Sequence, residues 1–454
     1  MNLRLQAAES PLRGVVAVPG DKSLAHRAAL FAAIADGESA IANYPDSGVT
    51  RAMRSALEAL GVSSSLEDGM LRVVGRGREA LTPSGDGPAR IYCGNSGTTF
   101  RLLAGVIAAS GIAAVLDGSE GLRRRPMGRI EEPLRRMGAD VASTDGHAPL
   151  AFRPARLHGI EYTLPVASAQ VLSCLELAAL GAQGESVFHV PGPVRDHTER
   201  MLRAMGAVVE TSGGVVRMSP AARLRPLCGT LPGDISSAAF LFVAAAIVPS
   251  SRVTIENVGV NPTRTGVLDV LARMGADISV SNVREMFGEP VGDVTVVASP
   301  LRGVEIGGDL VVRSIDEFPA LAVAAAFAEG TTTVRDAQEL RYKESDRIAA
   351  IVAQLRALGA EVSEAPDGFS IRGGTVRGGL ACANGDHRLA MSMALCGLRA
   401  PAPVAVAGAE ILDESFPEFT DLLARLRMDA AASGACRPAA EMISCPVRSS
   451  RAEN

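Results

Sequence analysis

Several short polar clusters stand at the beginnings of apolar stretches, and their side chains are of the types that bind anions. Lys22, Ser23 and Arg27 open one such stretch, and His26 follows Lys22 by one helical turn, so that the two share a helix face. Backbone N–H groups at a helix N-terminus attract anions, and lysine, serine and arginine side chains add charge and hydrogen-bond donors. The pattern predicts a site for phosphate and carboxylate groups, with a solvated basic helix face as the alternative.

Further polar clusters have the same placement along the chain. In order they are residues 94–101, 123–129, 167–170, 195–200, 314–319, 341–347 and 385–388. Helix dipoles that converge from two domains on one cleft would attract anions strongly. A structural role is the alternative: Ser168 could cap its helix, Asp316 could complement a helix dipole, and Pro126 is expected in the first turn of a helix. The dense charges at 341–347 would be costly to bury unless paired or bound to a ligand.

One short phrase recurs six times and indicates which elements position these clusters. It combines leucine, alanine, arginine or methionine with a final glycine, and it starts at residues 57, 134, 202, 271 and 355, with a degenerate copy at 423. The first four residue types favour helices, and glycine suits the position after a helix where φ is positive. Each copy predicts the end of an amphipathic helix followed by a strand, and the repeat predicts one supersecondary unit used six times.

A second internal match divides the chain. Residues 18–23 (VPGDKS) resemble residues 231–236 (LPGDIS), with three copies of the phrase between them and three after. This arrangement predicts two domains of three units each, and an N-terminal strand within 3–18 that pairs outside the first block. The predicted bounds are 20–232 for the first domain, 1–19 together with 233–427 for the second, and 428–454 for a flexible tail.

The two matching segments differ in the residues that could bind a ligand. Lys22 aligns with Ile235, and Arg27 aligns with Phe240. The copy at 231–236 therefore predicts the start of a buried apolar helix. The copy at 18–23 predicts an equivalent helix start that carries cationic side chains.

Composition restricts the classes of function. With 454 residues the chain is long enough for two domains, and 47% hydrophobic with 21% charged residues describes a packed globular protein. A net charge of -5 and the lack of tryptophan argue against a nucleic-acid partner. The chain start has no signal-peptide pattern, the longest apolar run (238–249) is too short for a membrane span, and the seven cysteines form no CxxC motif. We expect a cytoplasmic protein without a membrane partner or a metal.

Taken together, the motifs closely resemble those of the 5-enolpyruvylshikimate-3-phosphate synthase family, the 3-phosphoshikimate 1-carboxyvinyltransferases. The matching blocks, in the family order, are residues 19–27, 94–101, 125–129, 167–170, 195–199, 341–347, 386–388 and 415–419. Each block alone is weak, but all of them in order, covering the chain to about Arg427, are specific.

The resemblance implies an α/β (α+β) fold, a two-domain inside-out α/β barrel of six βαβαββ repeats, three per domain, that closes around its substrates. The implied reaction transfers the enolpyruvyl group of phosphoenolpyruvate to the 5-hydroxyl of shikimate 3-phosphate and releases phosphate. It belongs to the shikimate pathway to chorismate and the aromatic amino acids. The resemblance implies no metal or organic cofactor, and we expect a monomer whose partners are these two small substrates.

The resemblance also assigns site residues. The implied catalytic residues are Lys22, Asp316, Lys343 and Glu344, and which acid performs which proton transfer stays open. The residues implied to bind shikimate 3-phosphate are Lys22, Ser23, Arg27, Ser168, Ala169, Gln170, Arg195, Asp316 and Lys343. Those implied to bind phosphoenolpyruvate are Lys22, Asn95, Gly97, Arg125, Gln170, Arg347 and Arg388, whose guanidinium groups suit carboxylate and phosphate.

Some positions depart from the family pattern. Ser96 and Ala169 stand where alanine and serine are frequent. Glu414 stands where several members carry lysine or another non-acidic residue, and an acid there would repel phosphate. Gly97 is retained, and we expect ordinary sensitivity to the family's competitive inhibitor glyphosate.

Two other functions remain open from the residues. The sister enolpyruvyl transferase that acts on UDP-N-acetylglucosamine usually has a reactive cysteine in the loop before its Arg-Pro, and residues 117–126 contain none. A non-catalytic repeat scaffold that binds anions is the third possibility, and the presence of Asp316, Lys343 and Glu344 argues against it.

Overall fold

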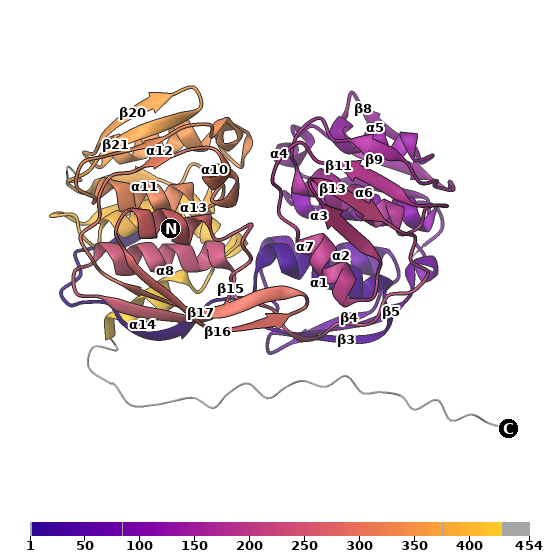
Figure 1. Cartoon of the computed structure of the whole chain (residues 1–454), viewed down its shortest axis with the longest axis horizontal. Coiled ribbons are helices and arrows are strands. Elements are labelled where there is room, and N and C mark those ends of the chain that lie inside the picture. The colour runs from indigo at the N-terminus through magenta and orange to yellow at the C-terminus, as the bar shows by residue number, and fades with distance from the viewer. Residues whose placement is uncertain (1, 84, 375, 429–454) are drawn as a thin grey trace.

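The computed structural model describes residues 2–83, 85–374 and 376–428, which form two lobes side by side (Figure 1). The tail expected at 428–454 lies outside these residues, except for Met428, which ends the last helix. None of the described helices has the length and apolar character that crossing a membrane requires.

Each lobe has its own hydrophobic core. The core of the first lobe consists of buried residues between Leu24 and Leu231. The core of the second lobe combines buried residues of the N-terminal segment, from Leu3 to Val18, with those from Ile235 onward. The N-terminal segment therefore packs with the second lobe.

Short strands alternate with helices along the whole described chain. The strands are β1 (Asn2–Leu5), β2 (Arg13–Ala17), β3 (Asp36–Ala42), β4 (Ser64–Glu67), β5 (Met70–Arg76), β6 (Ala89–Tyr92), β7 (Ala114–Asp117), β8 (Asp140–Thr144), β9 (His147–Arg153), β10 (Glu161–Thr163), β11 (Ser186–His189), β12 (Val209–Ser212), β13 (Val215–Met218), β14 (Cys228–Thr230), β15 (Arg252–Gly259), β16 (Asp277–Met286), β17 (Glu289–Val297), β18 (Glu305–Ile306), β19 (Thr331–Val334), β20 (Glu361–Ala365), β21 (Gly368–Arg372), β22 (Gly379–Cys382) and β23 (Val404–Ala407).

The helices are of two kinds, apolar ones and amphipathic ones. They are α1 (Lys22–Ile34), α2 (Gly48–Ala59), α3 (Gly97–Ser110), α4 (Glu120–Arg123), α5 (Gly128–Arg136), α6 (Ala169–Ala179), α7 (His197–Ala204), α8 (Ile235–Ile247), α9 (Gly266–Arg273), α10 (Asp309–Arg313), α11 (Phe318–Ala326), α12 (Arg347–Ala357), α13 (His387–Cys396) and α14 (Phe419–Met428), with short 3-10 turns η1 (Arg78–Ala80), η2 (Gln338–Tyr342) and η3 (Ala409–Glu414).

The described strands form six sheets, so the fold is a mixed α/β fold of six similar units. The sheet orders are β14-β3-β5-β4, β6-β7-β9-β8, β10-β11-β13-β12, β16-β17-β15-β2, β18-β19-β21-β20 and β1-β23-β22. In the second of these, β6 and β7 are parallel, and β9 is antiparallel to both β7 and β8. Each complete unit thus joins a β-α-β crossover to a hairpin.

Two units exchange their first strands between the lobes. Strand β2 pairs in parallel with β15 of the second lobe, after which the chain enters α1 of the first. Strand β14 pairs in parallel with β3 of the first lobe, after which the chain enters α8 of the second. The N-terminal segment also supplies β1, which pairs with β23. It therefore holds two strands where the sequence predicted one, and both pair outside the first lobe as expected.

The two Pro-Gly-Asp segments meet at this crossing. The N–H of Asp21 donates to the carbonyl of Pro232 at 2.7 Å, and the N–H of Asp234 donates to the carbonyl of Pro19 at 2.9 Å. Gly20 lies opposite Gly233, and a Cβ on Gly20 would lie 2.1 Å from the Asn43 carbonyl oxygen, so no larger residue fits there. The repeated motif therefore builds the junction between the lobes.

The recurring phrase forms the same helix end in its five glycine-containing copies. In α7, the N–H of Gly206 donates to the Arg203 carbonyl at 3.0 Å and that of Ala207 donates to the Leu202 carbonyl at 2.9 Å, which is a Schellman motif. The five glycines, Gly61, Gly138, Gly206, Gly275 and Gly359, all have φ between +76 and +102 degrees. The phrase is structural, as predicted.

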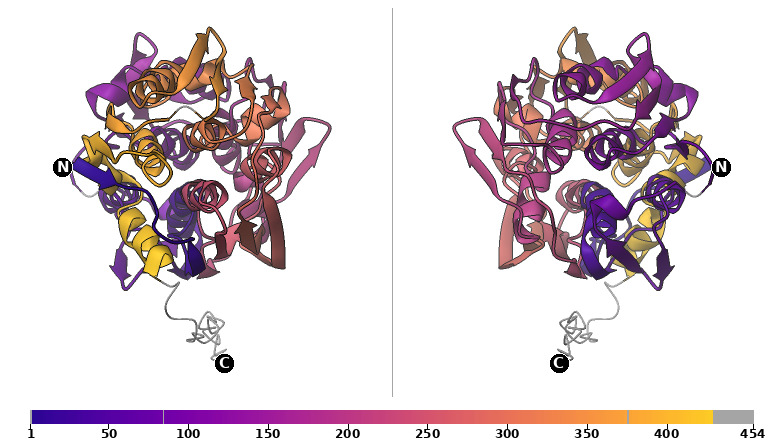
Figure 2. Two further views of the ribbon diagram at one scale, coloured as in Figure 1. Left: turned by 90° about the vertical axis from the view of Figure 1, so that its left-hand side faces the viewer. Right: turned by 90° about the vertical axis from the view of Figure 1, so that its right-hand side faces the viewer.

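Each lobe has apolar helices at its centre. Every residue of α8 is buried, as a helix that is hydrophobic on all sides requires. Helices α1, α3 and α6 of the first lobe and α8, α11 and α13 of the second are buried along most of their length. Figure 2 shows each lobe end-on, with helices toward the centre and strands toward the edge. Their starts carry most of the polar clusters.

The cap glycines give a test of this architecture. Gly206→Ala should lower the free energy of unfolding by about 1–2 kcal/mol, because φ is +96 degrees there and alanine is strained in the left-handed region. Gly85→Ala is the control, since no atom lies within 4 Å of its added Cβ. Urea unfolding measures both, and equal stabilities of the two variants would contradict the assignment.

Candidate active site

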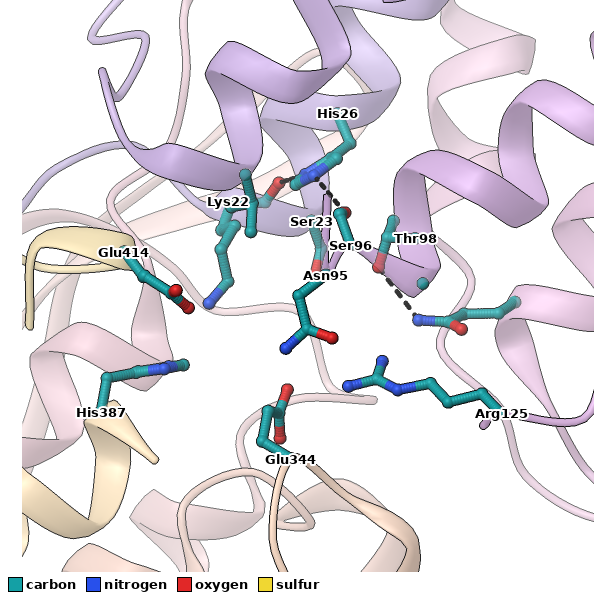
Figure 3. Close-up of a pocket in the computed structure, with 13 residues that line it drawn as sticks. Lys22, Ser23, His26, Asn95, Ser96, Thr98, Arg125, Glu344, His387 and Glu414 are labelled. Carbon is teal, nitrogen blue, oxygen red and sulfur yellow. Dashed lines mark hydrogen bonds between the residues drawn. The ribbon is translucent and has the colours of Figure 1, made fainter. Parts of the chain in front are cut away.

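An open cavity, with about 590 Å³ of empty space that includes open solvent, is lined by both lobes. Its lining residues are Lys22, Ser23, His26, Val49, Asn95, Ser96, Gly97, Thr98, Arg125 and Gln170 from the first lobe, and Glu344, His387 and Glu414 from the second. Figure 3 shows Lys22, Asn95 and Arg125 pointing toward the same space as Glu344 and His387. The folded chain thus gathers clusters that are far apart in the sequence, most of them at helix starts.

Helix α1 brings Lys22 to the cavity. Its N-cap is Asp21, whose Oδ1 accepts a hydrogen bond from the N–H of Leu24 at 2.9 Å. The ammonium of Lys22 donates to the Oγ of Ser415, a second-lobe residue, at 2.9 Å. Lys22 therefore already links the two lobes across the cavity.

Lysine is scarce in this protein, and its placement is a signal that the motif analysis missed. Of the 45 lysine and arginine residues, only Lys22 and Lys343 are lysines, and both belong to the site. Burial, together with the nearby charge of Arg388, lowers the pKa of Lys22 below its usual value. An ammonium in that environment releases its proton more easily than arginine, which stays protonated.

His26 connects α1 to the loop before α3. Its Nδ1 lies 2.6 Å from the Lys22 carbonyl and its Nε2 lies 3.2 Å from the Ser96 Oγ. Ser96 accepts hydrogen bonds from both the N–H and the hydroxyl of Thr99, so its own proton is free to go to Nε2. These partners fit a neutral imidazole that is protonated on Nδ1, and burial lowers the pKa of His26 to about 4.

Arg27 does not line the cavity but lies buried behind its wall. Its guanidinium donates to the hydroxyls of Thr198 and Ser173 at 2.8 and 2.9 Å and to the Ser23 carbonyl at 3.1 Å. Burial raises the pKa of the nearby Glu199 to about 7. In this geometry Arg27 holds together α1, α6 and α7.

Gly97 and Gln170 form a tight corner of the cavity. Gln170 accepts a hydrogen bond from Arg101, and its amide donates to the Thr98 hydroxyl at 3.0 Å. A Cβ on Gly97 would lie 2.9 Å from one Nη atom of Arg101 and equally close to one of Arg125. The absence of a side chain at Gly97 therefore leaves these two guanidinium groups in place.

A chain of ion pairs runs along the second-lobe side of the site. Asp316 lies 2.7 Å from the Arg195 guanidinium of the first lobe and 3.4 Å from the Lys343 ammonium. Arg347, which is 1% exposed, pairs with Glu344 at 2.7 Å and with Asp386 at 2.7 Å. The charges at 341–347 are thus mostly paired, and this pairing offsets the free-energy cost of burying them.

Both candidate carboxylates are held in their ionised form. Burial alone would raise the pKa of Asp316, but Lys343 and Arg195 outweigh it and hold the pKa well below its usual range. The same opposition acts on Glu344, where the cations Arg347 and Lys343 hold the pKa low despite burial. In this state Asp316 and Glu344 can accept protons or stabilise cations.

Eight of the expected site residues, Arg27 among them, lie beside the cavity rather than on it. Ser168 is the N-cap of α6 without a side-chain cap bond, and Ala169 is its first residue, next to the lining residue Gln170. Asp316, Lys343, Arg347 and Arg195 form the ion-pair chain, and the field of Arg388 reaches both Lys22 and Asp316.

The arginine run at 123–125 is split. Arg123 pairs with Asp117 and Arg124 with Glu120 on the surface, while Arg125 lines the cavity. Pro126 precedes α5 and does not sit in its first turn as predicted, because α5 begins at Gly128 with Met127 as its N-cap.

His387 and Glu414 are lining residues that the motif comparison had not assigned a role. The Nε2 of His387 is buried without a hydrogen-bond partner, and burial, aided by Lys22, lowers its pKa well below the usual value. Glu414 ends η3 and lines the cavity beside Lys22, Glu344 and His387. Among the described residues, no group of three His, Cys, Asp or Glu side chains is arranged to hold a metal ion.

Comparison with known proteins identifies the same family at the level of sequence and of structure. The family model for EPSP synthase (3-phosphoshikimate 1-carboxyvinyltransferase) matches residues 6–423. The 3-phosphoshikimate 1-carboxyvinyltransferase of Geobacter sulfurreducens is 49% identical over 415 residues, 91% of this chain and 96% of that protein, and that of Syntrophomonas wolfei is 46% identical over 424 residues, 92% and 98%. The solved EPSP synthase of Acinetobacter baumannii superposes with a TM-score of 0.86 at 40% identity, covering 94% of this chain and 98% of that one.

The neutral state of His26 predicts a pH dependence of stability. The pKa of His26 lies near 4 in the folded state and an ordinary histidine has a pKa of 6.5, so the unfolded chain takes up a proton first as the pH falls. The contribution of His26 to the free energy of unfolding is complete above pH 6.5. As the pH falls toward 4, the free energy of unfolding decreases by about 3 kcal/mol. His26→Gln should flatten that part of the profile in urea unfolding series, and parallel profiles for the two proteins would contradict the assignment.

Proposed function

The chain belongs to the EPSP synthase family and is a 3-phosphoshikimate 1-carboxyvinyltransferase of the shikimate pathway, and from this we propose how its residues divide the reaction. The enzyme joins the enolpyruvyl group of phosphoenolpyruvate to the 5-hydroxyl of shikimate 3-phosphate and releases phosphate. The observation that carries the proposal is that the two lysines of the sequence, one from each lobe, lie with the carboxylates Glu344 and Asp316 on or beside one cavity.

In this proposal, shikimate 3-phosphate binds mainly to the first lobe. Ser23, Ser168, Ala169 and Gln170 present hydroxyl, backbone and amide groups from the starts of α1 and α6. Arg195 supplies the charge for the phosphate, and Arg27 fixes the start of α1 from behind. This orientation brings the 5-hydroxyl toward Asp316 and Lys343.

Phosphoenolpyruvate binds between the lobes. Asn95, Gly97 and Arg125 line the cavity from the first lobe. Arg347 and Arg388 supply guanidinium groups from beside the cavity in the second lobe. Two acidic groups of the substrate, a phosphate and a carboxylate, match guanidinium forks better than they match single ammonium groups. Lys22 contacts both substrates.

The proton transfers follow from the charge states. An ionised Asp316 or Glu344 accepts the proton of the attacking 5-hydroxyl while C3 of phosphoenolpyruvate gains one. The lowered pKa of Lys22 makes its ammonium a proton donor at this site, and Lys343 keeps Asp316 ionised. The tetrahedral intermediate then loses a proton and phosphate to give the enol ether. The two acids are coupled, so the proposal assigns the steps to the pair.

We also propose the finer architecture. The two separate cores and the exchanged strands support two domains, 20–232 and 1–19 with 233–427, each an inside-out barrel of three βαβαββ repeats. We propose further that the enzyme is a cytoplasmic monomer that needs no cofactor. We also propose that glyphosate inhibits it at ordinary concentrations. The acid Glu414 beside the cavity is the position at which weaker phosphate binding is expected.

Lys22 is the first test. Lys22→Met should lower phosphate release from the two substrates by about 10³-fold or more, because it removes both a charge and a proton donor. Lys22→Arg keeps the charge but not the titrating amine, and should also be severely impaired. Arg51→Met, which removes an exposed cation of the same lobe, should be normal. Near-normal turnover by folded Lys22→Met would overturn the site assignment, and phosphate release with UDP-N-acetylglucosamine should be absent throughout.

Gly97 is the second test. Gly97→Ala should raise the KM for phosphoenolpyruvate about tenfold and leave that for shikimate 3-phosphate nearly unchanged, because its Cβ displaces the guanidinium groups of Arg101 and Arg125. Steady-state kinetics with each substrate varied in turn measure the effect. A rise confined to the KM for shikimate 3-phosphate would contradict the placement of phosphoenolpyruvate.

A further inference from the structure

Arg264 is a buried arginine between the two lobes that lies outside every cluster of the sequence analysis. It precedes α9, is 2% exposed, and touches the starts of helices from both lobes. Helices α1 and α8 lie in different lobes, on either side of the junction between them (Figure 1). The helix that follows it, α9, carries no residue of the proposed site. Any effect of Arg264 on the reaction must therefore act through the residues that it contacts.

The guanidinium joins the caps of the two equivalent helices. One Nη donates to Oδ2 of Asp21, the N-cap of α1, at 3.2 Å. The other lies 3.5 Å from Oδ1 of Asp234, the N-cap of α8, and donates to the Ser236 hydroxyl at 2.9 Å. These two aspartates belong to the paired Pro-Gly-Asp segments, so one side chain ties both crossings together.

The same guanidinium reaches two further helix starts. It lies 3.2 Å from Nε2 of His197, the first residue of α7, and 4.0 Å from the carboxylate of Glu317, the N-cap of α11. Ser236 also donates to Glu317. The carboxylates of Asp21, Asp234 and Glu317 therefore surround one cation, all within the protein interior.

Three of these contacts are close in sequence to a residue of the proposed site. Asp21 precedes Lys22, Glu317 follows Asp316, and His197 stands two positions after Arg195. Lys22 and Arg195 come from the first lobe and Asp316 from the second. A displacement of the Arg264 guanidinium would shift these groups relative to one another, although Arg264 is not a lining residue of the cavity.

We propose that Arg264 is a positioning residue for enolpyruvyl transfer, which fixes Lys22 and Arg195 of the first lobe relative to Asp316 of the second. The inference rests on the roles proposed above for Lys22 and Asp316. Lysine cannot replace it, since a single ammonium cannot bond to both crossings as the planar fork does. Its charge is needed as well, because three buried carboxylates without a cation would be strongly unfavourable.

The test is Arg264→Lys, which keeps the charge and removes the fork. We expect kcat to fall about 10²-fold, since a misplacement of about 1 Å can cost that much, while the KM for each substrate changes less than about fivefold. Arg264 touches neither substrate, so ground-state binding persists while alignment in the transition state is lost. A merely structural role would lower thermal stability without this separation of kcat from KM.

Arg399→Lys is the matched control. Arg399 donates to the Ile247 carbonyl at 2.7 Å, at the opposite end of α8, so its loss perturbs the same helix away from the junction. It should leave kcat unchanged. If Arg264→Lys does not fold, Arg264→Gln combined with Glu317→Gln removes one charge of each sign and should show the same loss of kcat.

Two results would overturn the proposal. One is a kcat within about threefold of the parent in either folded Arg264 variant, and the other is an equal loss of kcat in Arg399→Lys. The activity of Lys22→Met shows whether an error lies in the role of Arg264 or in the proposed site. If Lys22→Met is inactive and Arg264→Lys is normal, only the role of Arg264 is wrong.

Discussion

The crossing of the two Pro-Gly-Asp segments is the constraint on which the rest of the structure depends. Two reciprocal backbone hydrogen bonds pair the segments, and each segment leaves a strand in one lobe to start a buried helix in the other. The glycines allow the backbones to approach, and the aspartates cap the helices that follow. Because the lobes meet at helix starts, the partial positive charges of those starts face one region.

The cavity differs from the rest of the junction because only one of the two equivalent helices carries charge. Asp21 and Asp234 perform the same capping, yet Lys22 follows the first and Ile235 the second. A buried apolar helix such as α8 needs no partner for its side chains. A buried lysine needs one, and it finds Ser415 and the carboxylates on the far side of the cavity. The two copies of one motif thus differ in charge, and the proposed catalytic role of Lys22 rests on that difference.

The sequence predicted the features that are local. The Schellman ends follow from leucine, glycine and alanine at fixed positions, and the buried helices follow from their apolar residues. It predicted less well what depends on distant partners. Pro126 fell outside a helix turn, the N-terminal segment formed two strands, and Arg264 gave no signal, because its partners Asp21, Asp234 and Glu317 are far from it in sequence. The scarcity of lysine can be seen in the sequence alone, and it would have indicated Lys22 and Lys343 as candidate site residues.

In the proposed mechanism, the ion pair between Arg195 and Asp316 links substrate binding to the chemistry. These side chains pair at 2.7 Å, so Arg195 neutralises the carboxylate that is proposed to accept the hydroxyl proton. A phosphate that binds Arg195 competes for that guanidinium and weakens its hold on Asp316. The carboxylate then becomes a stronger base when the hydroxyl arrives, while Lys343 still keeps it ionised. With the roles proposed for Arg195 and Asp316, binding energy at the phosphate would be converted into reactivity at the hydroxyl, which is what differential binding of the transition state requires.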